Sequence, residues 1–149
     1  MDSVYIPTVT PKEIVGSKET SEDIQGKAQK KTPAFTINVD KNSDGTKPDT
    51  VTPSTEYPAK LIDPKTGDKV DSYSVDGVGS YTIDPTTGEV TFQPLPSYTG
   101  TAPTAQVSLT AVVGHDKNGN AITSTASGYY TPTVTAVTPT ATPVSYTHL

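Results

Sequence analysis

Residues 79–94 read GSYTIDPTTGEVTFQP and predict a β-hairpin. Apolar and polar residues alternate on both sides of the centre, and a period of two residues places the apolar side chains of a strand on one face. In the central Pro85-Thr86-Thr87-Gly88 segment, proline presets φ and glycine tolerates positive φ, so this segment is expected to form the turn. The inward-facing residues of the predicted hairpin are Tyr81, Ile83, Val90 and Phe92.

The segment downstream of this hairpin predicts a second one. Gln106–Val113 alternates with Val107, Leu109, Ala111 and Val113 on the apolar face, and Ile122–Thr131 does so with Ile122, Ala126 and Tyr130. Between the two strands lies Asp116-Lys117-Asn118-Gly119-Asn120. Because Asn-Gly pairs tolerate positive φ at both central positions, the sequence predicts a type I′ turn here.

The upstream segment predicts three shorter strands. Phe35–Val39 alternates clearly, and Thr55–Asp63 alternates less clearly because Pro58 restricts it to a sheet edge or a bulge. Pro64–Asp68 is expected to form a hairpin loop that leads into a strand over Val70–Val75. Pro11–Lys31 shows no sustained apolar period, so it is interpreted as an irregular connector, with a short helical turn near Ser21–Gln25 as the alternative.

Composition alone does not show whether the chain is folded or disordered, so the alternation of apolar and polar residues must decide. Val, Ile, Leu and Phe account for 28 of the 149 residues, about 19%, which is close to the range of disordered chains. The net charge is only −5, so self-repulsion does not keep the chain open. Short alternating strands with frequent turn signals favour an all-β, antiparallel, Ig-like sandwich of about seven strands.

Several classes of protein are disfavoured by residue content. The chain lacks arginine and is acidic, which argues against nucleic-acid binding. It also lacks cysteine, which excludes disulfides, zinc–thiolate sites and cysteine nucleophiles. No apolar stretch approaches the ~20 residues of a membrane-spanning helix, and no signal peptide is recognised, so no membrane insertion is expected.

An internal echo suggests that the chain contains one complete repeat. Pro7-Thr8-Val9-Thr10 recurs as Pro132-Thr133-Val134-Thr135, 125 positions later. Residues 1–10 are therefore interpreted as the end of a preceding repeat, 11–135 as one repeat, and 136–143 as the start of the next repeat or a linker. Residues 144–149 read VSYTHL, which matches a translated sequencing-adapter end and is interpreted as a processing scar.

The sequence resembles the fibril repeat of CshA-type streptococcal surface adhesins. The resemblance rests on residues 79–94 and on further segments along the chain: Thr8–Ile14, Ile24-Gln25-Gly26 with Gln29, Thr32-Pro33-Ala34-Phe35, Tyr98-Thr99-Gly100-Thr101-Ala102, Val107-Ser108-Leu109 and Asp116-Lys117-Asn118-Gly119. It implies a β-sandwich module that is repeated in tandem on a secreted, cell-wall-attached protein. In that family the repeats form a stalk, host ligands bind elsewhere, and there are no catalytic residues to transfer.

Residues 40–45 read DKNSDG and match the first half of a calcium-loop pattern. An EF-hand is excluded because its twelfth position needs a bidentate glutamate and is Val51 here. A different loop remains as a hypothesis, in which Ca²⁺ would be bound by Asp40, Asn42, Asp44 and Asp49. The preferred hypothesis is an Asx-rich turn whose side chains bond to their own backbone, with no cofactor.

Four further features are similar to chemical sites, but ordinary structure explains them better. Leu95–Gly100 is similar to a sortase signal but has one residue too many, and it is interpreted as a loop. His115 next to Asp116 is interpreted as a solvated turn histidine, because no positioned nucleophile accompanies it. A Lys60–Asn38 crosslink would need a buried lysine, which is rare. Four tyrosines are interpreted as amphipathic residues at the rim of the sandwich, with an adhesive patch as the alternative: Tyr57, Tyr73, Tyr98 and Tyr129.

The sequence thus predicts a non-enzymatic stalk repeat at a bacterial cell surface, which projects a distal binding region. Its expected partners are neighbouring repeats of the same chain, and a host surface ligand through the full-length protein. One alternative is an adhesive module that contacts host glycoprotein or glycan directly. A more distant alternative is an accessory domain of an extracellular wall or carbohydrate enzyme, which would require a catalytic neighbour.

Overall fold

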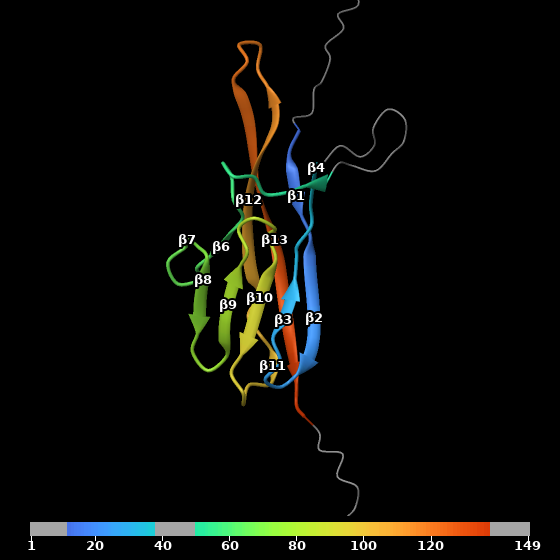
Figure 1. Cartoon of the computed structure of the whole chain (residues 1–149), viewed down its shortest axis with the longest axis vertical. Helices are drawn as coiled ribbons and strands as arrows, with labels where there is room; N and C mark the ends of the chain where they lie inside the picture. Colours follow the sequence, from blue (N-terminus) through green and yellow to red (C-terminus); the bar gives the residue numbers. More distant parts are fainter. Residues whose placement is uncertain (1–11, 38–49, 138–149) are drawn as a thin grey trace, which may run out of the picture.

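The computed structural model describes residues 12–37 and 50–137, which form an elongated all-β sandwich (Figure 1). These residues contain thirteen strands and no helix, so the predicted all-β class is confirmed. The strands are more numerous than the seven or so expected because prolines, glycines and sheet crossings divide several of them. Three sheets result, and two of them face each other across the core.

The first of the two facing sheets has the order β3-β10-β9-β8. Its strands are β3 (Gln29–Lys31), β10 (Val90–Pro94), β9 (Gly79–Ile83) and β8 (Ser72–Val75). The second facing sheet has the order β11-β13-β12-β6-β7, with β2 paired to the other edge of β13. Its strands are β11 (Gly100–Thr101), β13 (Ala121–Thr135), β12 (Ala105–His115), β6 (Lys60–Ile62), β7 (Lys69–Val70) and β2 (Lys18–Ile24). The small third sheet joins β1 (Ile14–Gly16), β4 (Phe35–Ile37) and β5 (Thr50–Val51) in the order β1-β4-β5.

The predicted hairpin over residues 79–94 is confirmed as β9 and β10. Ile83 lies opposite Val90, and the amide of Asp84 donates to the carbonyl of Glu89 at 2.9 Å across the turn. Gly88 has a φ of 80°, as the turn requires. All four predicted inward residues are buried, and they pack against apolar side chains of the opposite sheet: Leu61, Val107, Leu109, Tyr130 and Val134.

The second predicted hairpin exists as β12 and β13, but its turn type was predicted wrongly. Gly119 has a φ of 84°, whereas every described residue other than glycine, Asn118 included, has a negative φ. A type I′ turn needs positive φ at both central residues. The carboxylate of Asp116 explains the difference, because it accepts hydrogen bonds from the amides of Asn118 at 2.8 Å and Asn120 at 2.9 Å and closes a longer loop.

The prediction of an irregular connector or a helical turn over residues 11–31 is also wrong. This part of the chain forms β1, β2 and β3. β2 alternates between exposed and half-buried residues without a buried apolar side chain, because it is a lateral strand paired through its backbone to β13. A hydrophobic period does not detect such a strand.

Two other predicted strands have different bounds. Thr55–Asp63 is reduced to β6, because residues 54–57 form a turn closed by a bond from the amide of Ser54 to the carbonyl of Tyr57 at 3.1 Å. Val70–Val75 is interrupted at Asp71, where the chain passes from the second sheet to the first. The hairpin loop between β6 and β7 is confirmed, and the predicted strand at Phe35 is confirmed as β4 over its described residues.

The third sheet packs against the N-terminal half of β13, where two glycines allow close contact. A Cβ atom on Gly16 would lie 2.2 Å from the carbonyl oxygen of Ser127, and one on Gly128 would lie 2.7 Å from Cβ of Pro33. Both positions therefore lack room for a side chain, and the backbones of β1 and β13 come into direct contact. Beyond this contact the chain continues from β1 into β2, which pairs with the edge of β13.

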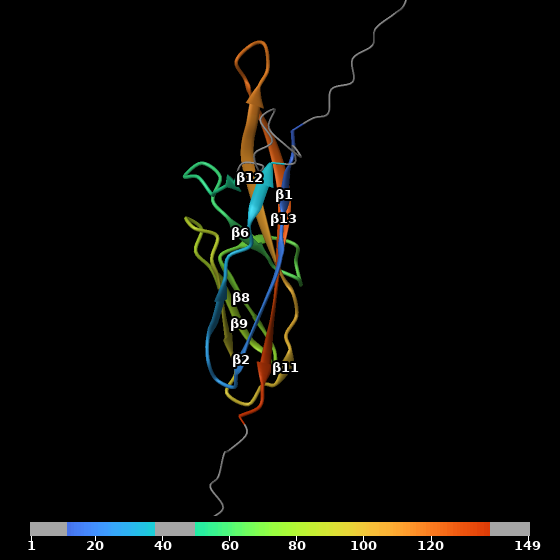
Figure 2. The same cartoon turned by 90° about the vertical axis from the view of Figure 1, so that its right-hand side faces the viewer.

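Figures 1 and 2 show where the described chain starts and stops. β1 begins near one end of the long axis, and β13 finishes at the other end. At the β1 end, the β12–β13 hairpin projects beyond the rest of the described fold in both views. The ends of the module are named here the hairpin end and the exit end.

Candidate load-bearing site

The first long strand of the described chain, β2, pairs in parallel with its last strand, β13. Lys18–Ile24 lies beside Tyr129–Thr135 over seven consecutive residue pairs. Two further backbone bonds flank this ladder: the amide of Tyr129 donates to the carbonyl of Ser17, and the amide of Gln25 donates to the carbonyl of Thr135, each at 2.9 Å. The first and last long strands of the described chain are thus bonded along their whole shared length.

A buried polar network fastens this strand pair to the opposite sheet. Gln29, on β3, is only 4% exposed. Its amide nitrogen donates to the carbonyl of Thr133 on β13 at 2.9 Å, and its amide oxygen accepts the hydroxyl of Ser21 on β2 at 2.5 Å. The hydroxyls of Ser21 and Tyr130 are also bonded to each other. Because every member is satisfied, the network connects three strands without leaving an unpaired buried group.

Burial raises the pKa of the tyrosines in and near this core. The pKa of Tyr130 is raised by desolvation, against which its bond to Ser21 acts. Tyr73 stacks on Tyr81 with ring centroids 5.0 Å apart, and burial followed by the Asp63 carboxylate raises the pKa of Tyr73 to about 12. The pKa of Tyr81 is raised further, first by burial, and its hydroxyl donates to the carbonyl of Pro103 at 2.5 Å. The raised pKa values favour the neutral form of these phenols, and the neutral Tyr81 hydroxyl is the one that donates to Pro103.

The direction of the strand pair decides how it responds to tension. β2 is entered from the hairpin end, and β13 leaves at the exit end (Figure 1). Tension on the two ends therefore pulls the strands past each other along their length. Because the backbone bonds run across the strands, this shear loads the ladder as a whole, whereas peeling from one end would break its bonds one at a time. The arrangement is suited to bearing load.

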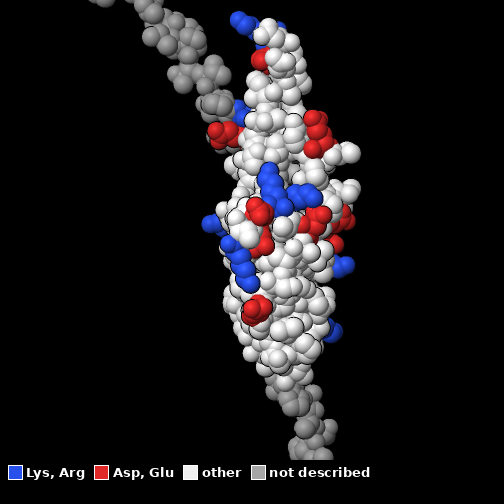
Figure 3. Space-filling model, turned by 90° about the vertical axis from the view of Figure 1, so that its left-hand side faces the viewer, with Lys and Arg blue, Asp and Glu red and all other residues white. Residues whose placement is uncertain are grey.

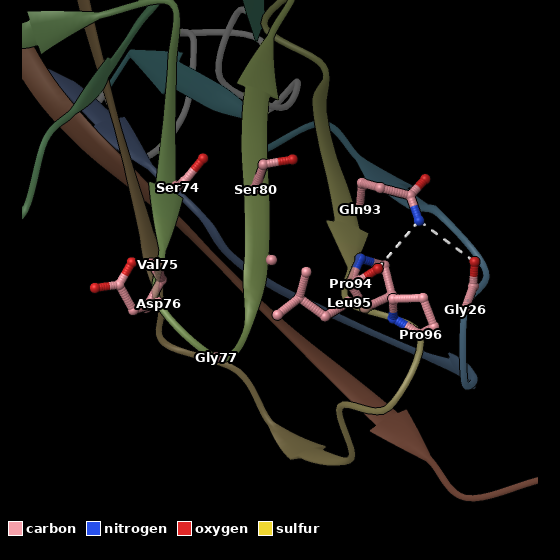
Figure 4. Close-up of a pocket in the computed structure, with 11 residues that line it drawn as sticks. Gly26, Ser74, Val75, Asp76, Gly77, Ser80, Gln93, Pro94, Leu95 and Pro96 are labelled. Atoms are coloured by element: carbon pink, nitrogen blue, oxygen red, sulfur yellow. Dashed lines mark hydrogen bonds between the residues drawn. The ribbon is translucent and has the colours of Figure 1, made fainter.

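An open groove of about 540 Å³ lies at the exit end (Figure 4). It is lined by the β8–β9 turn, by the 93–96 segment and by Gly26. In Figure 4 the Leu95 side chain extends towards the β8–β9 turn, and the amide nitrogen of Gln93 donates to the carbonyl of Gly26 at 3.3 Å. The sortase-like segment that begins at Leu95 forms a turn, closed by a 3.0 Å bond from the amide of Tyr98 to the carbonyl of Leu95. The groove walls are mostly backbone and small side chains.

Charged side chains are interspersed rather than gathered into one patch on the face shown in Figure 3. Lys60 pairs with Asp71 at 2.7 Å, between β6 and the crossing to β8. Both side chains are partly exposed, so this pair adds little stability. Asn38, the residue that the crosslink hypothesis pairs with Lys60, lies outside the described residues, so the crosslink stays a hypothesis.

The predicted calcium ligands also lie outside the described residues: Asp40, Asn42, Asp44 and Asp49. The calcium loop and the Asx-rich turn therefore both stay predictions. In residues 12–37 and 50–137, no group of three or more His, Asp or Glu side chains could hold a metal ion. The same residues contain no helix long and apolar enough to cross a membrane.

The remaining sequence candidates are placed as follows. His115 is exposed at the end of β12, and its neighbour Asp116 uses its carboxylate to close the turn, which lowers the pKa of Asp116. The four tyrosines considered as rim or adhesive residues are all half-buried: Tyr57, Tyr73, Tyr98 and Tyr129. Sequence reasoning missed the hydrogen-bonding roles of Ser21 and Gln29, because residues 18–23 are all polar and show no apolar period.

These features define a class of protein: an elongated all-β module whose first and last long strands are locked side by side and whose ends point apart. The chain belongs to the family described as the surface adhesin CshA repetitive domain, which matches residues 11–134. No curated protein matches the chain. The resemblance found in the sequence is thus confirmed. The chain is a repeat of a surface adhesin, and this family implies a location at the cell surface.

Proposed function

We propose that this chain is a structural stalk repeat of a cell-wall-attached adhesin. In this role it projects a distal binding region away from the cell, and it transmits tension from one neighbouring repeat to the next. One observation carries the proposal: the parallel β2–β13 pair is loaded in shear when the chain is pulled at its two ends.

The load path follows from the contacts described above. Tension enters through β1, which is held against β13 by the close approach of Gly16 to Ser127. It then reaches the seven residue pairs of the β2–β13 ladder, which Gln29 ties to the opposite sheet. Rupture requires shearing this ladder, and only then does the core between the two sheets open. The rate of forced unfolding is therefore set by the bonds of the terminal strands.

Single-molecule force spectroscopy on the full chain tests this role. We expect a higher rupture force when the chain is pulled through its two ends than when it is pulled through its N-terminal end and a cysteine at Asn118→Cys. The second geometry places both attachment points on the hairpin-end side, so the sheet is peeled open. Asn118 is exposed in a turn, so the substitution is expected to leave the fold intact. Equal rupture forces in both geometries would contradict the load-bearing role.

A binding experiment separates this role from that of an adhesive module. The stalk role predicts that the isolated chain does not bind host glycoproteins or glycans saturably. Saturable binding that is lost on substitution of a half-buried tyrosine such as Tyr129→Ala would favour the adhesive alternative, since tyrosine is enriched at binding hot spots.

A further inference from the structure

The outer edge of β2 has no strand partner among the described residues. In this part of the chain β2 pairs only with β13, and β3, which follows β2 in the sequence, pairs instead with β10 of the opposite sheet. Figure 1 shows β2 along the right-hand margin of the described fold, and Figure 2 views the molecule from that side. An open edge of seven residues is long enough to pair with a strand of another molecule.

The backbone groups of alternate residues of β2 point towards this open edge. The bonds that flank the ladder join the backbones of Ser17 and Gln25 to β13. Because successive residues of a strand bond to opposite sides, the odd-numbered residues of β2 face β13 and the even-numbered ones face outwards. Lys18, Thr20 and Glu22 therefore direct their amide and carbonyl groups along the outer edge.

The charges of β2 favour one way of pairing with a second copy of this strand. Lys18, Thr20 and Glu22 are all exposed. In an antiparallel pair centred on Thr20, each Lys18 lies opposite a Glu22 of the other copy, which stabilises the pair. Centring the pair on either neighbouring residue instead places Glu19 opposite Glu19 or Asp23, and like charges in this position destabilise a strand pair. A parallel pair in register also sets like charges side by side.

We propose that the β2 edges of two copies of this chain pair antiparallel, with Thr20 at the twofold axis and a Lys18–Glu22 pair on each side of it. The outward-facing residues of the two copies exchange backbone hydrogen bonds, and one sheet continues across both molecules. Because a twofold contact uses the same surface on both partners, it closes on itself and gives a dimer rather than a fibre. The contact holds the load-bearing strand at its second edge, and it does not depend on the stalk role.

Disulfide trapping through single cysteines tests this pairing in the full chain. The chain has no cysteine of its own, so a variant with one introduced cysteine forms a disulfide only between two molecules. Opposite residues of a bonded antiparallel pair have Cα atoms about 5.5 Å apart, which a disulfide spans, so Thr20→Cys reports the contact. Thr82→Cys is the matched control, because Thr82 is also an exposed strand threonine but lies on β9, which has partners on both edges.

The expected result is faster trapping at position 20. Edge pairing buries little surface, so the contact is weak and the variants are compared at about 0.5 mM protein. We expect Thr20→Cys to form its disulfide-linked dimer about tenfold faster than Thr82→Cys, because pairing raises the effective concentration of the two thiols. Adding Lys18→Glu, which sets carboxylates opposite each other, should lower the rate to that of the control, and adding Glu22→Lys as well should restore it.

Two results would overturn the inference. One is an equal rate for Thr20→Cys and Thr82→Cys, with both proteins folded by circular dichroism. The other is a fast reaction of Thr20→Cys that Lys18→Glu leaves unchanged, because the antiparallel register requires the charge pairs. The rupture force of a single molecule is measured without a second copy, so it tests the stalk role separately.

Discussion

Replacing Gln29 with methionine tests whether the buried network holds the terminal strands to the rest of the fold. Methionine has the length and flexibility of glutamine but neither donates nor accepts a strong hydrogen bond. The substitution removes the bond to the Thr133 carbonyl and the bond from the Ser21 hydroxyl, which keeps its bond to the Tyr130 hydroxyl. The backbone ladder between β2 and β13 is left intact, so the variant isolates the contribution of the side chain.

The expected loss of stability can be worked out from these contacts. A partly buried carbonyl that loses its side-chain donor, here that of Thr133, costs about 1–3 kcal/mol, and the lost bond from the Ser21 hydroxyl adds about 1 kcal/mol. Burial of the thioether returns about 1 kcal/mol. The free energy of unfolding should therefore fall by about 2 kcal/mol, which lowers Tm by roughly 6–10 °C for a domain of this size.

Urea and thermal unfolding of the full chain, followed by circular dichroism and tyrosine fluorescence, measure this change. Gln93→Met is the matched control, because Gln93 is exposed and its amide nitrogen makes only long bonds, to the Gly26 carbonyl at 3.3 Å and to the Pro94 carbonyl at 3.2 Å. We expect the control to change stability by less than about 0.5 kcal/mol. If Gln29→Met and Gln93→Met destabilised the chain equally, the network would have no special role and the reasoning would be refuted.

Three other predictions follow from single features of the molecule. Gly16→Ala should lower the free energy of unfolding by about 3 kcal/mol or more, because the added Cβ would lie 2.2 Å from the Ser127 carbonyl oxygen. Urea denaturation midpoints measure this change, and a loss below about 1 kcal/mol would contradict the close packing of β1 on β13. Because the pKa of Tyr73 is raised to about 12, the phenol ionises in the unfolded chain near pH 10 while it stays neutral in the fold, so stability should fall as pH rises from about 10 to 12. Tyr73→Phe should flatten this part of the pH profile in urea titrations, and an unchanged slope would argue against it. If the 40–49 segment is an Asx-rich turn, neither Ca²⁺ nor EDTA should shift Tm; a Ca²⁺-dependent rise that Asp44→Asn abolishes would favour the calcium loop instead.

The best-predicted parts of the fold are those in which side-chain alternation and turn chemistry agree. Tyr81, Ile83, Val90 and Phe92 alternate around a Pro-Thr-Thr-Gly turn, and each is buried as expected. The facing sheet was predicted less completely. Val107 and Leu109 are buried, but Ile122 has the same period and is 48% exposed, because the hairpin extends beyond the opposite sheet. Alternation identifies the two faces of a strand, and the neighbouring sheet decides which residues are covered.

The candidate site was not predicted, because it is made of backbone and polar contacts. β2 has no buried apolar residue, and its parallel pairing with β13 joins positions more than a hundred residues apart. The Ser21–Gln29–Tyr130 network likewise brings together three residues that no spacing relates. Local propensity carries no information on such pairings, because their free energy comes from tertiary contacts that form only when the sheets assemble.

The all-β class, the central hairpin and the family can be predicted from the sequence alone, because a two-residue period, turn residues and a repeat motif are local properties of the chain. The tertiary structure alone decided that the first and last long strands lie side by side and that Gly16 touches the backbone of β13. These are properties of strand order and direction, which are set by how the sheets pack together as the whole chain folds.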